Sequence, residues 1–224
     1  MLEFYKKNKY NKINIVLAFI TWFINIVFLI IGIILKNNES NFYVSIILAF
    51  IFPLIIPMIE IVFKKRIPYL LEIVVCIQTI LALSISQTFN MYENWKNWDM
   101  LLHGMMGLEG TIIGYFICII YGGTDWNFFK KVVFIIAFVL AFASLWEIME
   151  YTCDNIFNTD FQKVFDPNEK SGVSDTMNDI IIALIVCLVS VFICFIDNII
   201  KKRLINYLNK TLNIKELNGE DNNV

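Results

Sequence analysis

Charged residues are scarce in this chain of 224 residues, of which 17% are Asp, Glu, Lys or Arg and 58% are hydrophobic. A soluble domain has about 25% charged residues, so the composition excludes an ordinary soluble protein. The lysines and arginines form no extended basic surface, and nothing resembles a nucleic-acid-binding domain. The apolar residues lie in long uninterrupted runs, which is the pattern of membrane-spanning segments. The predicted environment is therefore a lipid bilayer.

Cysteine and histidine offer few metal motifs. The five cysteines never show CxxC spacing, and four lie in apolar runs, where a thiol behaves as a small buried hydrophobe. Cys153 lies near acidic residues and could act as a soft ligand. His103 is the single histidine, so any imidazole ligand must be this residue.

Stretches of about 20 apolar residues predict an all-α fold, a polytopic membrane bundle of six transmembrane helices. We expect one transmembrane domain over residues 1–210 and a polar cytoplasmic tail over residues 211–224. Pro53 and Pro57 predict a kink in the second helix, which membrane helices tolerate. The predicted spans are residues 13–35, 42–63, 67–86, 99–121, 132–151 and 176–200.

The distribution of basic residues predicts the orientation of the spans. With a cytoplasmic amino terminus, 14 of the 18 lysines and arginines lie on the cytoplasmic side. This asymmetry follows the positive-inside rule, so we predict that both termini are cytoplasmic. Glu60 and Glu72 then lie toward the inner side near Lys64, Lys65 and Arg66, and need only be local ion partners.

Three pairs of ionisable residues interrupt the second half of the chain at the ends of apolar runs. Each pair has i,i+3 or i,i+4 spacing, which places both side chains on one helix face. Charged groups at membrane depth cost roughly 2.5–3.5 kcal/mol each, so they usually belong to a functional site. The pairs are Asp99 and His103, Glu147 and Glu150, and Asp175 and Asp179.

Helix rise places the three pairs at similar depth. Glu147 lies 16 residues after Lys131, about 24 Å along a helix, and Asp179 lies 22 residues before Lys201, about 33 Å. With a hydrocarbon core about 30 Å thick, both lie in the outer leaflet, where Asp99 begins its span. The sequence therefore predicts one outward-facing site.

Helical angles indicate which faces are buried. At about 100° per residue, His103, Gly107, Gly110 and Gly114 all lie within roughly 80° of Asp99. Small residues let membrane helices approach closely, so this face is expected to pack against another helix. On the fifth span, Tyr151 and Asp154 share the face of the acidic pair and are predicted to support it.

Two carboxylates have alternative interpretations. Ser174 or Asp175 could cap the sixth helix, or Asp175 could belong to the site. Glu109 is the deepest carboxylate of the fourth span and points away from His103. It could be a protonated packing residue or a step in an ion path.

One imidazole with several carboxylates is a plausible ligand set for a divalent cation. Oxygen ligands suit Mg²⁺, Ca²⁺ or Mn²⁺, and the histidine also admits Zn²⁺ or Fe²⁺. An internal polar cluster of protonated carboxyls is the structural alternative. The predicted metal ligands are Asp99, His103, Glu147, Glu150 and Asp179, with Asp154, Asp175, Tyr151 and Glu109 in support.

These residues lie in three motifs: Trp98-Asp99-x-x-x-His103, Trp146-Glu147-x-x-Glu150-Tyr151 followed by Asp154, and Gly172-Val173-Ser174-Asp175-Thr176-x-x-Asp179. Over residues 88–190 the chain resembles the YjdF family of bacterial multi-pass membrane proteins. That resemblance implies a multi-pass protein of the bacterial plasma membrane and supports the residue set, without implying a reaction. More distantly the motif order is similar to VanZ-type proteins, associated with glycopeptide tolerance, although Ala183 and Val186 replace an expected Asn and a small residue.

Three functions follow from these features. The favoured one is an enzyme whose metal activates water or polarises a phosphate on an envelope or lipid-linked substrate. The second is an ion or proton transporter, for which Glu109 and the glycine face argue. The third is a non-catalytic membrane protein whose polar cluster fixes helix packing.

Overall fold

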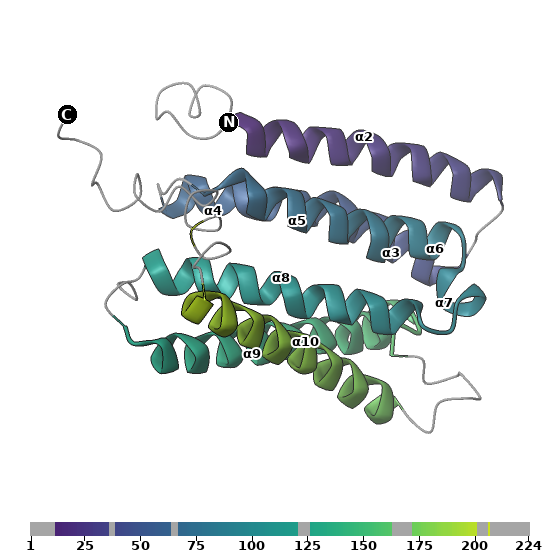
Figure 1. Cartoon of the computed structure of the whole chain (residues 1–224). Coiled ribbons are helices and arrows are strands. Elements are labelled where there is room, and N and C mark those ends of the chain that lie inside the picture. Colours follow the sequence, from purple (N-terminus) through teal and green to yellow (C-terminus); the bar gives the residue numbers. More distant parts are fainter. Residues whose placement is uncertain are drawn as a thin grey trace.

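The computed structural model describes residues 12–35, 39–63, 67–120, 126–162, 172–200 and 206. Six helices in these segments are long and apolar enough to cross a membrane, which confirms the predicted fold class. They lie alongside one another, with an N-terminal set, α2–α6, on one side and a C-terminal set, α8–α10, on the other (Figure 1). The basic clusters at 64–66 and 201–203 and the tail 211–224, on which the predicted orientation and tail rest, lie outside the described residues.

The N-terminal set contains three spans, two of them built from several pieces. The first span is a single helix, α2 (Lys12–Ile34). The second span is interrupted near Pro53, as predicted, because a proline cannot donate a backbone hydrogen bond. Its pieces are α3 (Ser40–Ile51), η1 (Phe52–Leu54) and α4 (Ile55–Phe63). The third span comprises α5 (Tyr69–Thr79), the π-helical segment η2 (Ile80–Ile85) and α6 (Ser86–Thr88).

The C-terminal set contains three continuous helices. After the short α7 (Met91–Asn94) come α8 (Trp98–Ile120), α9 (Phe128–Phe157) and α10 (Gly172–Ile200). α9 is longer than its predicted span because its ends have strong signals. Asn127 caps the start by accepting a hydrogen bond from the Lys130 amide, and Asn158 ends it in the left-handed conformation, φ 53°.

The glycine face of α8 packs against α9 and α10, which confirms that expectation. A Cβ added at Gly107 would lie 2.3 Å from the backbone oxygen of Ala183, so the backbones of α8 and α10 are in close contact. Gly110 and Gly114 face α9, where a Cβ at Gly114 would lie 3.0 Å from the Phe138 ring. Small residues thus bring the three helices close enough to share a polar site.

The two sets are joined near the start of α8. The Trp98 indole donates a 2.6 Å hydrogen bond to Ser86, whose own hydroxyl donates to the Leu81 carbonyl within the π-helical segment. Such segments leave carbonyls available for side-chain donors and occur often near functional sites. The apolar cluster around Trp98 and Leu102 surrounds this contact and fixes the start of α8 against the N-terminal set.

Candidate functional site

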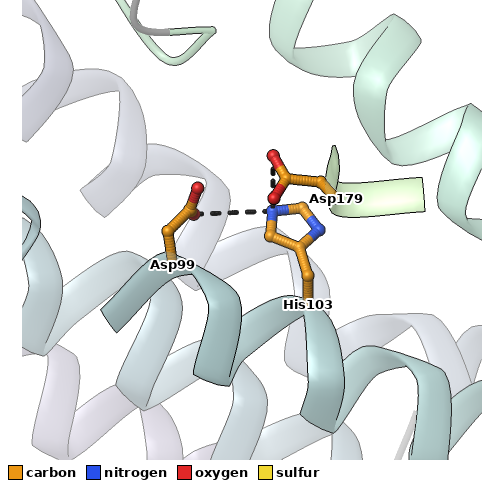
Figure 2. A group of neighbouring side chains, drawn as sticks. All are labelled: Asp99, His103 and Asp179. Carbon is orange, nitrogen blue, oxygen red and sulfur yellow. Dashed lines mark ion pairs between the residues drawn. The ribbon is translucent and has the colours of Figure 1, made fainter. Parts of the chain in front are cut away.

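The single histidine lies between two helices of the C-terminal set. His103 and Asp99 project from one face of α8, one turn apart, and Asp179 reaches the same imidazole from α10 (Figure 2). His103 Nε2 lies 3.5 Å from Asp99 Oδ1 and 3.6 Å from Asp179 Oδ2. His103 and Asp179 are each only 3% exposed, so both carboxylates meet the ring inside the bundle.

These separations suit ligands around an ion better than direct hydrogen bonds. Charge-assisted N–H···O bonds are about 2.7–2.9 Å long. Two ligands each about 2.1 Å from a tetrahedral ion lie roughly 3.4 Å apart, close to both observed N···O distances. One ligand atom from each of Asp99, His103 and Asp179 lies within 4.8 Å of the others. The group could therefore hold a metal ion with three protein ligands.

A third helix contributes a carboxylate to the other imidazole nitrogen. Glu147 of α9 is 4% exposed, and its Oε1 lies 3.9 Å from His103 Nδ1. In the described residues His103 Nδ1 and Asp179 Oδ2 have no hydrogen-bond partner. Glu147 therefore lies beside the second imidazole nitrogen at a distance longer than a hydrogen bond, and is not one of the three grouped ligands.

The other predicted members of the α9 motif have different positions. Glu150 accepts a 2.8 Å hydrogen bond from the Trp146 indole and does not join the three-residue group. Tyr151 is 59% exposed, so it does not extend the buried site. Glu147 lies one turn earlier on the same face of α9 and is 4% exposed, so the buried part of this face ends between the two residues.

Asp154 organises the loop that follows α9. It accepts hydrogen bonds from Thr159, at 2.6 Å, and from the amides of Phe161 and Gln162, at 2.8 and 3.1 Å. The Gln162 side chain in turn donates to Thr176 in the first turn of α10. Asp154 thus serves the site indirectly, by holding the loop that leads toward the helix of Asp179.

Replacing Asp154 with alanine is expected to open this loop. Three hydrogen bonds to one carboxylate would be lost, and charge-assisted bonds contribute about 1.5–3 kcal/mol each before solvent replaces them. We expect hydrogen-exchange protection of the Phe161 and Gln162 amides to fall at least about tenfold, equivalent to 1.4 kcal/mol. Thr152→Ala, at an exposed site whose hydroxyl donates to the Ile148 carbonyl, should leave this protection unchanged. Equal protection in both variants would contradict this role.

The structure bears on the alternative interpretations of Asp175 and Glu109. α10 begins at Gly172, so Ser174 and Asp175 lie inside its first turn and neither is the N-cap. Asp175 is 4% exposed and lies one turn from Asp179, where a carboxylate suits the positive end of the helix dipole. Glu109 is buried within α8, about 9 Å along the helix axis from His103, and does not belong to the three-residue group.

Tyr92 is a neighbour of the site that the sequence did not indicate. It lies on α7, and its hydroxyl donates to the Ala82 carbonyl at 3.4 Å. Desolvation, and then the negative charges of Asp99, Glu150 and Asp179, raise the pKa of the Tyr92 phenol well above its usual range. No motif predicts it, because α7 is a single turn between two spans.

The comparisons identify one family. The family model described as "Predicted membrane protein (DUF2238)" matches residues 16–198, which cover part or all of each of the six spans and every residue of the site. No curated protein and no solved structure matches the chain.

Proposed function

The chain belongs to the DUF2238 family of predicted membrane proteins, and we propose that it is a metal-dependent hydrolase with its centre at Asp99, His103 and Asp179. The observation that carries the proposal is the pair of carboxylates at 3.5 and 3.6 Å from one imidazole nitrogen. Three protein ligands and one open position is the arrangement of catalytic zinc sites, as distinct from closed structural ones. The YjdF resemblance of the three motifs supports the same residues.

The surrounding residues have separate roles in this proposal. A divalent ion bound there would act as a Lewis acid toward a carbonyl or phosphoryl oxygen and would acidify water. Glu147 lies 3.9 Å from His103 Nδ1, and in this proposal its negative charge favours the ring orientation in which Nε2 faces Asp99 and Asp179. In this proposal its second oxygen is the acceptor for the proton of an attacking water molecule. Burial of His103 and Asp179 strengthens the charge interactions between them.

The substrate class follows from the location of the centre. Asp99 lies at the second residue of α8, so the site is near one membrane surface and within reach of a lipid headgroup. The distribution of Lys and Arg supports an outward-facing site in a bacterial plasma membrane. A lipid-linked or envelope ester or phosphate is the substrate that this placement favours.

Metal analysis tests the centre and hydrolysis tests its function. Protein purified in detergent should contain about one divalent ion per chain, and Asp179→Asn should retain less than about a tenth of it. Glu93→Gln, at an exposed acidic residue of α7, is the matched control and should keep the ion. The loaded protein should release phosphate from a polyprenyl pyrophosphate in mixed micelles. A metal-free wild type would refute the centre, whereas a loaded but inactive protein would refute hydrolysis of this substrate.

A further inference from the structure

A second carboxylate pair lies inside the N-terminal set, away from the histidine. Glu60 of α4 and Glu72 of α5 are both 0% exposed, and they lie close enough to influence each other electrostatically. They are near the apolar cluster of Leu71 and Phe116, about 20 Å along α8 from the level of His103. The predicted partners at 64–66 lie outside the described residues. Two carboxyls at this depth are costly unless protons or specific bonds compensate them.

The hydrogen bonds distinguish the two carboxyls. Glu60 Oε1 accepts two N–H groups, from Asn14 Nδ2 at 3.1 Å and from the Ile67 amide at 2.8 Å, which is the environment of a charged carboxylate. Among the described residues, Glu72 Oε1 accepts a hydrogen bond only from the Cys76 thiol, a weak donor, at 3.4 Å. Glu72 Oε2 and Asn14 Oδ1 are buried acceptors without a hydrogen-bond partner in the described segments. A proton on Glu72 would convert one of these acceptors into a donor.

Polar residues continue from this pair along the buried face of α2. Asn14, Thr21 and Asn25 occupy positions i, i+7 and i+11, which share one helix face about 16 Å long, and each is at most 2% exposed. Thr21 lies next to the Cys76 thiol, one turn from Glu72. Asn25 accepts a 2.7 Å hydrogen bond from Ser84 of the π-helical segment.

We propose that the Glu60–Glu72 pair binds one proton and that this polar face of α2 conducts protons between the pair and the π-helical segment. In the transfer within the pair, the O–H bond of Glu72 breaks and an O–H bond forms on Glu60, so charge and protons balance. Beyond the pair, protons move through hydroxyl groups and water molecules bridging the polar side chains. Interhelical polar bonds alone would also hold the helices together. Such bonds do not explain the two fully buried carboxyls or the buried acceptors that lack donors in the described segments.

Proton flux into liposomes tests the proposal. Wild-type protein should collapse an imposed pH gradient, followed with a pH-sensitive dye and with the membrane potential clamped by valinomycin and K⁺. Glu72→Gln should slow that rate at least about tenfold, toward empty vesicles, because glutamine cannot release a proton. Glu93→Gln, at an exposed residue of α7, should match wild type. Glu109→Gln should also match it, since Glu109 lies on α8.

Two results would overturn the proposal. A wild-type rate equal to that of empty vesicles excludes conduction, and an unchanged rate in folded Glu72→Gln excludes the pair.

Infrared spectroscopy provides a readout that does not depend on flux. The wild type should show the carbonyl band of a buried carboxylic acid, and Glu72→Gln should lower its intensity whereas Glu93→Gln should not. Absence of that band from the wild type would exclude the shared proton.

Discussion

Substitution of Gly107 by alanine is expected to cause the largest loss of stability of any single methyl group added to α8. The new Cβ would lie 2.3 Å from the Ala183 oxygen and 2.9 Å from its carbonyl carbon and Cα, all backbone atoms of α10. No side chain can rotate away to relieve this contact. Overpacking costs about 1–3 kcal/mol, and we expect the upper end of that range. For a chain of this size the unfolding midpoint in detergent, followed by circular dichroism, should fall by roughly 6–12 °C.

Gly104 provides the matched control on the same helix. A Cβ there would make ordinary contacts, 3.6 Å from Val186 and 3.9 Å from Ile182, both with side-chain atoms of α10. Because alanine also favours the helix by about 1 kcal/mol over glycine, Gly104→Ala should leave the midpoint unchanged or raise it. Equal losses in the two variants would show that the backbone contact of Gly107 does not determine the separation of α8 and α10.

The same contact links helix packing to the site. Ala183 lies one turn after Asp179 on α10, and Gly107 lies one turn after His103 on α8. Any separation of the two backbones at Gly107 would therefore widen the 3.6 Å spacing between His103 and Asp179. Gly107→Ala should consequently weaken metal binding, whereas Gly104→Ala should not.

Much of this arrangement could be predicted from residue spacing. The uninterrupted apolar runs are enough to identify six spans, because backbone groups in lipid must be satisfied within helices. The four-residue interval from Asp99 to His103 and the following glycines also predict the buried face of α8. The helical period shows which residues share a face, and in α8 the face of the glycines packs against α9 and α10.

Other features depend on contacts that no local pattern contains. Tyr151 and Glu147 share one face of α9, yet only Glu147 is buried, because neighbouring helices cover this face at Glu147 but not one turn further along. Asp154 bonds to a loop whose fold the sequence does not reveal. The burial of Glu60 depends on Asn14, 46 residues away on another span. Such long-range pairings become visible only when the helices are assembled.

Removal of the carboxylate at Glu147 is expected to weaken metal binding without abolishing it. Glu147 lies 3.9 Å from His103 Nδ1, whereas Asp99 and Asp179 lie at Nε2, so Glu147 acts on the ion through the ring. Loss of a second-shell partner typically costs 10–100-fold in affinity. We expect a decrease of about that size in Glu147→Gln, measured by competition with a chromophoric zinc chelator in detergent.

His103→Ala sets the other end of the scale, because it removes the only imidazole of the chain and one of the three ligands. The metal affinity of His103→Ala should be lower than that of Glu147→Gln and below the measurable range.

Glu150→Gln is the matched control on α9. The Glu150 carboxylate accepts a hydrogen bond from the Trp146 indole and lies outside the ligand group, so the metal affinity should stay within about twofold of wild type. If Glu150→Gln bound metal more weakly than Glu147→Gln, Glu150 would belong to the metal site and the proposed action of Glu147 through the His103 ring would be wrong. The graded order, with His103 weakest, Glu147 intermediate and Glu150 unchanged, is the outcome that a centre built around one imidazole requires.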